Sequence, residues 1–421
     1  MKPTVYQEIS VGAMRAFRAI VPEPHNRIPL TWNNAPTLLA SFLPFVFLAY
    51  LARRPGTYQM RLLLLPTVIV ANLTTGFRYM FTIPELNVYN WGMALLSEVV
   101  IAKALEYALT KEGMLKVGER QPGQLKGKEP VKGSDASTNG HAEPDALEAR
   151  LFPPWLYDSF ELIHTMRGLR WKFAQGTHIP TPTRPQERRA FLRATLMSFL
   201  TNFLLLDLFE SIVKIFPGVG VPSGGTIFYA ALAPVPRALL AGFRMVYDLI
   251  TLVAVGALAS APASWPPVMD RPWHASSMHT LWAHSWHQLL RNTFLVLGGY
   301  PGRWLAGDLG MLLGTFVASG LYHECSMYTM GRGFDHTVTL FFAAQGPLLI
   351  GERLWRKLTG RRVGGLFGRL WVYFVMFIAA QPLVDSWHKR GLGGGMVIMP
   401  VISPVRITLG VLQKYWGVGR P

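Results

Sequence analysis

Residues 37–52 read TLLASFLPFVFLAYLA, an apolar run without a charged side chain, and Arg53-Arg54-Pro55 follow it at once. A run of this kind is typical of a membrane-spanning helix, because about 20 apolar residues cross the hydrocarbon core and basic residues remain at the headgroups. Similar runs recur along the chain, at residues 37–52, 62–77, 88–109, 191–216, 238–259, 305–322, 338–350, 366–384 and 396–411. They predict an all-α, polytopic membrane protein with about eight or nine transmembrane helices.

The composition agrees with this fold class. Of 421 residues, 50% are hydrophobic and only 15% are charged, whereas soluble domains carry about 25% charged residues. The formal net charge is nevertheless +17. A soluble nucleic-acid-binding domain would need charged residues over most of its surface, so we expect no nucleic-acid partner. The basic surplus instead suits the flanks of membrane segments.

The chain is predicted to have four parts. Residues 1–36 form an extramembrane segment without the layout of a secretory signal, and residues 37–110 hold the N-terminal transmembrane helices. Residues 111–150 are polar, rich in Gly and Pro and balanced in charge, which predicts a disordered loop. Residues 151–421 form the membrane core. Cys325 is the single cysteine, so no intrachain disulfide is expected.

The first polar stretch between membrane runs is residues 270–300, DRPWHASSMHTLWAHSWHQLLRNTFLVLGGY. Ionisable residues at membrane depth are costly and are candidates for function. On a continuous helix, His284, His287 and Arg291 would share one face, and Trp282 and Trp286 would share another. Such a segment suits the edge of a cavity.

The second polar stretch is residues 319–325, SGLYHEC, where an apolar run meets His323 and Glu324. His323 is either a histidine at the membrane interface whose hydrogen bonds are satisfied and that has no catalytic role, or a general base. The second role is chemically open because a neutral imidazole accepts a proton near pH 7. Glu324 either orients His323 or faces water. A third stretch, residues 166–171 (MRGLRW), and the basic residues from Arg184 to Arg193 are by themselves typical of membrane-flanking anchors.

Together these stretches resemble one family. The ordered pair Trp282-x-x-x-Trp286-His287-Gln288-x-x-Arg291 and Ser319-Gly320-Leu321-x-His323-Glu324 resembles the wax-synthase branch of the membrane-bound O-acyltransferases. The segment Arg167-Gly168-Leu169-x-Trp171 resembles a further element of the fungal members. Leu281 stands where the first motif usually has Phe, and His284-Ser285 replace basic residues, which bears on the shape of the acceptor more than on the reaction.

The resemblance implies transfer of an acyl group from acyl-CoA, the co-substrate, to a hydroxyl group, with no bound cofactor or metal. His323 would be the base, and His287 would stabilise the negative charge on the carbonyl or hold the donor. The implied substrate-binding residues are Trp282, Trp286, Gln288, Arg291 and Glu324. The alternative role for Trp282 and Trp286 is packing between helices. The alternative role for Gln288 is a hydrogen bond to a backbone group. Arg167, Arg184 and Arg188 are candidate contacts for the CoA phosphates.

The implied donor is acetyl-CoA and the implied acceptor is a hydrophobic, terpenoid-type alcohol of secondary metabolism. A long-chain wax ester synthase, using fatty acyl-CoA and a fatty alcohol, is the alternative. A membrane di-iron hydroxylase is more remote, because such sites need many histidines and this chain has no His-His pair. A transporter would explain the spans but not the histidines. The endoplasmic reticulum membrane is the expected location, and the oligomeric state stays open.

Overall fold

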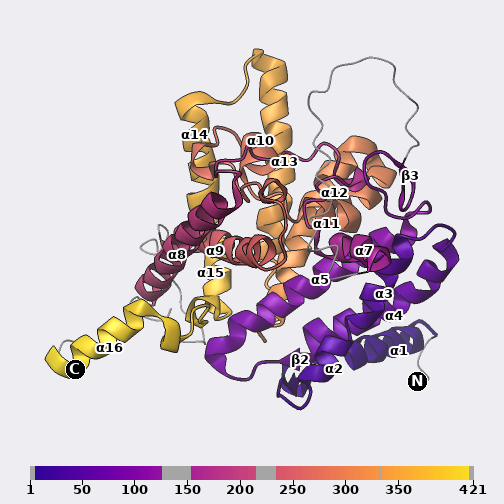
Figure 1. The fold of residues 1–421 in the computed structure, drawn as a ribbon, viewed down its shortest axis with the longest axis horizontal. Helices are drawn as coiled ribbons and strands as arrows, with labels where there is room; N and C mark the ends of the chain where they lie inside the picture. The colour runs from indigo at the N-terminus through magenta and orange to yellow at the C-terminus, as the bar shows by residue number, and fades with distance from the viewer. Residues whose placement is uncertain (1–4, 126–152, 215–233, 332, 417–421) are drawn as a thin grey trace.

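The computed structural model describes residues 5–125, 153–214, 234–331 and 333–416, and it is almost entirely helical (Figure 1). The longer helices are α1 (Val5–Ile20), α3 (Leu43–Ala52), α4 (Tyr58–Arg78), α5 (Asn87–Leu109), α7 (Pro154–His164), α8 (Arg188–Val213), α9 (Pro234–Gly256), α12 (Tyr300–Tyr328), α13 (Thr337–Thr359), α14 (Gly365–Tyr373), α15 (Gln381–Lys389) and α16 (Pro404–Trp416). Three shorter ones are α2 (Ala35–Ala40), α10 (Met278–Thr280) and α11 (Arg291–Phe294). The predicted all-α class is confirmed.

Strands are few and short in the described part of the chain. Strand β1 (Ile28–Pro29) pairs in parallel with β2 (Tyr79–Met80), and β3 (Glu119–Gln121) pairs antiparallel with β4 (Gln124–Leu125). Helices α1 to α5 and α7 form one group, α8 packs against α9, and α12 packs against α13 (Figure 1). The cavity described below lies where α5, α9, α12, α13 and α15 approach one another.

Six helical segments of the described residues are long and apolar enough to cross a membrane. They are Ala35–Ala52, Tyr58–Arg78, Arg188–Val213, Arg237–Gly256, Arg291–Tyr328 and Gly365–Lys389. Helices α5 and α13 also cover predicted runs, but α5 carries Glu98, Lys103 and Glu106, and the last two turns of α13 are charged. The run at 396–411 is not a span, because α16 begins only at Pro404 and has 13 residues. Six is therefore fewer than the eight or nine expected, and the part of the 191–216 run beyond residue 214 lies outside the described residues.

The charges on α5 are directed into the protein. The Glu106 carboxylate accepts a hydrogen bond from Asn292 at 2.7 Å, and Glu98 accepts one from Ser326 at 3.2 Å. The Lys103 ammonium donates to the carbonyl of Thr165 at 2.6 Å. Buried polar groups need such partners, because an unpaired one loses its hydration without replacement. These bonds tie α5 to α7 and to both arms of the hairpin described next.

Residues 291–328 are a hairpin of two helical arms rather than one long helix. Ala306 (φ −144°) and Gly307 (φ +60°, ψ −147°) leave the helical conformation, and the chain reverses there. Glycines face glycines across the two arms: a methyl group built on Gly314 would stand 2.2 Å from the Gly298 carbonyl oxygen. Small residues allow helix backbones to pack this closely. The predicted run at 305–322 therefore begins at the turn and follows the second arm.

Gly314→Ala is expected to destabilise the protein, because the added carbon would force the two arms apart. Overpacking of this kind costs about 1–3 kcal/mol or more. The measurement is the temperature at which the detergent-purified protein loses its monodisperse elution peak. Gly351→Ala is the matched control, since Gly351 lies on α13 with nothing within 4 Å of a built Cβ. Equal melting temperatures for the two variants would contradict the packing of the hairpin.

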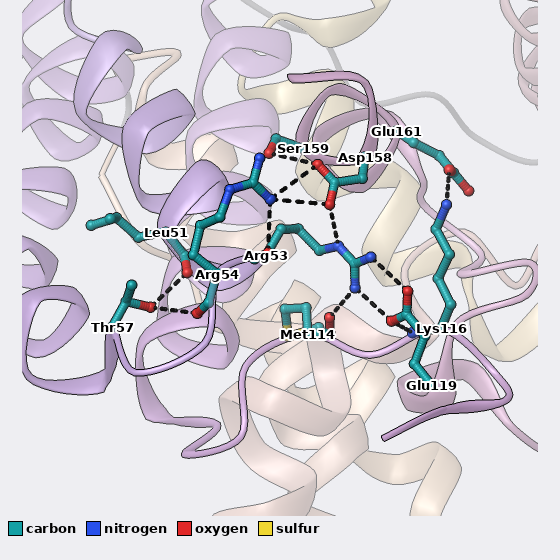
Figure 2. A network of polar contacts seen from close by, with 10 residues as sticks. All are labelled: Leu51, Arg53, Arg54, Thr57, Met114, Lys116, Glu119, Asp158, Ser159 and Glu161. Atoms are coloured by element: carbon teal, nitrogen blue, oxygen red, sulfur yellow. Dashed lines mark hydrogen bonds and ion pairs between the residues drawn. The ribbon is translucent and has the colours of Figure 1, made fainter. Parts of the chain in front are cut away.

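The first part of the predicted disordered loop is folded. Glu119 is 6% exposed and receives two hydrogen bonds from the Arg53 guanidinium, at 2.7 and 2.8 Å (Figure 2). Arg53 also donates to Asp158 of α7 at 2.9 Å, so it joins the end of α3 to two later segments (Figure 2). The prediction of disorder is wrong for residues 111–125, because a polar composition does not reveal an ion pair with a distant arginine. Residues 126–150 of the predicted loop lie outside the described residues.

Candidate active site

An apolar cavity of about 150 Å³ lies at the centre of the helical core. Its walls come from α5, α9, α12, α13, α14 and α15 and from the segment between α9 and α12. The lining side chains are mostly aromatic or aliphatic, and no carboxylate, lysine or arginine occurs among the described residues that line it. Two histidines, His287 and His323, are the basic groups at its surface. The cavity thus presents two imidazoles in an apolar, water-poor setting.

His323 projects from the second arm of the hairpin, where α12 passes the cavity. Its ring stacks on Phe342 of α13, with ring centres 4.4 Å apart and an angle of 17° between the planes. Tyr322 packs edge-on against the same ring at 5.2 Å. The Nδ1 atom is enclosed and has no hydrogen-bond partner among the described residues. Aromatic stacking, rather than a hydrogen bond to Nδ1, therefore sets the orientation of this imidazole.

His287 enters the cavity from the segment between α10 and α11. Its ring lies 4.6 Å from Phe243 of α9 and 5.5 Å from Trp286. Its Nδ1 atom is likewise enclosed without a partner among the described residues. Burial lowers the pKa of the His287 imidazole to about 4, and the charge of Arg167 acts in the same direction. His287 is therefore neutral at physiological pH.

The expected single helix through His284, His287 and Arg291 is not formed. A π-helical turn, Leu281–Ser285, ends at Trp286, whose ψ of 154° is extended. Gln288 donates to the carbonyls of Trp282 and Trp286, both at 2.9 Å, and so closes the end of that turn. His284 consequently turns away from His287 and lies 4.7 Å from His178. Periodicity alone could not reveal this break, since it depends on a side-chain bond to the backbone.

The two tryptophans of the first motif line the cavity together. Trp282 and Trp286 pack edge-to-face with ring centres 6.0 Å apart. The Trp282 indole donates to the Gln345 side chain of α13 at 3.2 Å, which orients the ring. Gln288, by contrast, is engaged with the backbone and is not part of the lining. Arg291 also lies outside the lining and donates to Thr177 at 3.3 Å.

Glu324 does not line the cavity, so it neither orients His323 nor contacts a substrate there. It is 1% exposed and pairs with Arg390 at 2.6 Å, and it accepts a hydrogen bond from the backbone of Asp335. Adjacent residues on a helix point in different directions, so Glu324 cannot face the cavity when His323 does. Its ion pair instead joins the second arm of the hairpin to the end of α15.

The three arginines predicted to contact the CoA phosphates lie in three different environments. Arg167 is 7% exposed and donates to the Pro266 and Pro267 carbonyls and to the Tyr247 hydroxyl. Arg184 pairs with Asp248 at 2.6 Å in a second, polar pocket. Arg188 is exposed and donates to the Gly256 carbonyl at 3.2 Å. Only Arg184 of these three lines a described pocket with room for a phosphate.

Sequence reasoning missed residues that shape the site from α9 and α13. Phe243 and Phe342 pack directly on the two imidazoles, but phenylalanine is common in apolar helices and gives no signal there. Glu352 accepts hydrogen bonds from the backbone of Met278 and His279 and holds the segment that carries the tryptophans. Gln345, a polar residue within the predicted run 338–350, is the one that the cost of polar groups in membranes would have flagged.

Comparison with known proteins gives the following similarities. Residues 265–344 match the model of the "Membrane bound O-acyl transferase family". Acetyltransferase aurG of Calcarisporium arbuscula is 24% identical over 251 residues, which cover 50% of this chain and 61% of that protein. O-Mevalon transferase macI of Penicillium terrestre is 25% identical over 233 residues, covering 48% and 53%. O-Mevalon transferase yanI of Aspergillus niger is 27% identical over 235 residues, covering 47% and 51%.

The chain spans about half to three-fifths of the length of these curated relatives. No solved structure matches it. The segment that matches the family model contains Trp282, Trp286, His287 and His323. The expected resemblance to this family is confirmed for residues 265–344.

Proposed function

We propose that the protein is a membrane O-acyltransferase that moves an acyl group from acyl-CoA to the hydroxyl group of a hydrophobic alcohol. The observation that carries the proposal is the apolar cavity with His287 and His323 at its surface, both inside the segment that matches the family model. An alcohol becomes a good nucleophile only when a base takes its proton. An imidazole facing a dry cavity supplies such a base and keeps water from the thioester.

In the proposed reaction His323 accepts the proton of the acceptor hydroxyl while the oxygen attacks the thioester carbonyl carbon. The new C–O bond forms, the C–S bond breaks, and the proton passes to the leaving CoA sulfur, so that ester and free CoA result. Because no carboxylate lines the cavity among the described residues, nothing there stabilises a lasting imidazolium. The proton transfer is therefore expected to be concerted with attack.

His287 is proposed to act on the acyl donor. The carbonyl oxygen gains negative charge as the alcohol attacks, and a positioned N–H donor lowers the energy of that state. A neutral imidazole carries one N–H, so His287 meets the requirement without a net charge. Trp282 and Trp286 are proposed to form the wall against which the apolar acceptor packs. Gln288 is proposed to hold the backbone of that wall, and Arg291 and Glu324 to support the site from outside the cavity.

We propose acetyl-CoA as the donor and a terpenoid-type alcohol as the acceptor, with the endoplasmic reticulum as the location. A cavity of about 150 Å³ suits a compact acyl group, since pockets for larger ligands measure about 300–1,000 Å³. The name of one relative also refers to acetyl transfer. Two others are named as O-mevalon transferases, so transfer of a group other than acetyl is the variation to test beside it.

The purified protein is expected to form ester faster from acetyl-CoA and a polycyclic terpenoid alcohol than from palmitoyl-CoA and a fatty alcohol. The small, aromatic cavity leaves little room for a long acyl chain, whereas the acceptor class is proposed from the resemblance and not from the cavity volume. The measurement is kcat/KM for the four donor and acceptor combinations, with ester identified by mass spectrometry. Preference for palmitoyl-CoA with the fatty alcohol would support the wax ester synthase instead. Stoichiometric iron with no ester from any combination would favour the hydroxylase.

A further inference from the structure

A second pocket, of about 520 Å³, lies beside the histidine cavity on the other side of α9. It is bounded by residues 180–186, the first turns of α8, the middle of α9 and residues 265–271. Three arginines line it, Arg184, Arg244 and Arg271, together with the aromatic rings of Phe191, Tyr247 and Trp265. The two histidines proposed for the acyl transfer do not line this pocket. Its size lies in the range of pockets that hold ligands of nucleotide size.

The charge of this pocket is not balanced. Arg184 pairs with Asp248 at 2.6 Å, and the strongly exposed Arg271 lies 3.5 Å from Asp270. Asp270 in turn is shared with His178 at 3.0 Å. Arg244 is exposed and has no ion pair or hydrogen bond to any residue in the described part of the chain. Arg244 therefore lines the pocket without an ion-pair partner among the described residues.

A second uncompensated cation lies under the pocket wall. The buried Arg167 guanidinium bonds only to neutral oxygens, namely the carbonyls of Pro266 and Pro267 and the Tyr247 hydroxyl. Burial lowers the pKa of Arg167, although an arginine remains charged. Pro267 and Tyr247 themselves line the pocket, so this charge lies directly behind them. With it, the pocket and its wall hold four guanidinium groups and two carboxylates among the described residues.

The position of Arg244 adds a physical requirement. It lies within Arg237–Gly256, one of the segments apolar enough to cross a membrane. A charged side chain at membrane depth is costly unless it faces water, a counter-charge or a polar cavity. The pocket meets this requirement for Arg244, and an anion within the pocket would meet it more fully.

The pocket and the histidine cavity share a wall. Along α9, Leu240 and Phe243 line the cavity, and Arg244, Tyr247 and Asp248 line the pocket. Val268 and Met269 line the pocket and belong to one packed cluster with Leu240, Phe243 and Trp286 of the cavity. Side chains of α9 and of this cluster thus form a wall common to the two spaces. A ligand with an anionic end and a thin apolar arm could occupy both.

We infer that this pocket receives the nucleotide and phosphate end of the acyl-CoA donor, with Arg244 and Arg271 as its phosphate contacts. The inference rests on the proposed function and locates the donor for it. Guanidinium groups bind phosphate oxygens through paired N–H groups, and the aromatic rings offer flat surfaces for a purine base. The pantetheine arm then passes the Val268–Met269 wall toward His287. Arg184 supports the pocket through Asp248, while Arg188 and Arg291 lie outside it.

The test compares two donors on the detergent-purified full chain. Acetyl-CoA has the nucleotide, whereas S-acetyl-N-acetylcysteamine keeps the thioester and lacks every phosphate. Arg244→Gln is expected to raise KM for acetyl-CoA by about 10- to 100-fold, because a lost charged hydrogen bond has an effect of that order. It should leave kcat with acetyl-CoA and all constants with the truncated donor within about two-fold. Arg244→Gln with Arg271→Gln should raise that KM further.

The matched control is Arg361→Gln, an exposed arginine on the loop between α13 and α14, which should not change KM for either donor. Free CoA binding, measured by calorimetry, gives a readout without turnover. Loss of CoA binding in Arg244→Gln supports the pocket even if no ester is formed by wild type, in which case only the proposed reaction fails. Unchanged KM and unchanged CoA affinity in the double variant overturn the pocket and leave the reaction standing. Arg244-dependent binding of phosphatidylglycerol vesicles without any for CoA would also overturn it, in favour of a lipid headgroup.

Discussion

His323→Ala is expected to lower kcat for ester formation by about 10²- to 10⁴-fold, which is the usual contribution of a general base. The alcohol proton would then have no acceptor in a cavity whose described lining has His287 as its one other imidazole. KM for the donor should change little, since the His323 ring stacks on Phe342 rather than on the α9 side of the cavity. The measurement is the initial rate of ester formation with acetyl-CoA and a terpenoid alcohol.

Two other histidines make this experiment specific. His284→Ala should keep near wild-type activity, because His284 is exposed and lies against His178, away from the cavity. His287→Ala should reduce kcat less than His323→Ala, since it would remove an oxyanion contact and leave the base in place. Near wild-type turnover in a correctly folded His323→Ala variant would show that the base is another group. Full activity of His287→Ala alone would remove only that residue from the proposal.

Arg53→Ala is expected to destabilise the protein by about 3–5 kcal/mol, the cost of breaking a buried ion pair by removing one partner. Glu119 would remain buried, and Asp158 and the Met114 carbonyl would lose their bonds to Arg53 as well (Figure 2). The Arg53 guanidinium also lies 5.0 Å from the centre of the Trp171 ring, so packing is lost with the charge. The measurement is the melting temperature in detergent and the yield of monodisperse protein.

The control for Arg53 is a second substitution that removes the stranded charge. Arg53→Met with Glu119→Leu should melt at a higher temperature than Arg53→Met alone, because a buried pair replaced by apolar side chains leaves no unpaired carboxylate between them. Arg54→Ala should have a small effect, since that side chain is 24% exposed and surface pairs contribute about 0–1 kcal/mol. A double variant less stable than the single one would mean that Arg53 acts through packing and not through its charge.

Hydropathy alone predicted the position of most of the candidate membrane-spanning helices. The runs at 37–52, 62–77, 191–216 and 238–259 coincide with segments that the structure holds as long apolar helices. Hydropathy is a local property, so a window of sequence carries most of the information. The run at 305–322 lies within the candidate span Arg291–Tyr328, but hydropathy did not reveal the turn at Gly307 or the first arm that packs against it. The prediction of disorder from composition failed at residues 111–125, because Arg53, the ion-pair partner of Glu119, lies far upstream in the sequence.

Some residues of the candidate site could be recognised in the sequence, and the contacts of others only in the structure. The motif around Trp282, Trp286 and His287 and the later His323 were both recognisable in the sequence, and the structure brings all four to one cavity. The roles proposed for Gln288, Arg291 and Glu324 changed, because each of these side chains is bonded to protein groups outside the cavity. The contacts by which Gln345 and Glu352 orient the tryptophan segment from α13 emerged only from the structure.

The sequence by itself determined the membrane class, the position of most spans and the two histidines worth testing. Apolar runs and short motifs suffice for these, since each depends on residues that are neighbours in the chain. The tertiary structure decided which polar side chains face the cavity and which arginines are already paired. The Glu324–Arg390 and Arg184–Asp248 pairs result from contacts between distant segments, and Arg244 has no ion pair among the described residues. Such contacts depend on how helices pack, and no local pattern of residues contains that information.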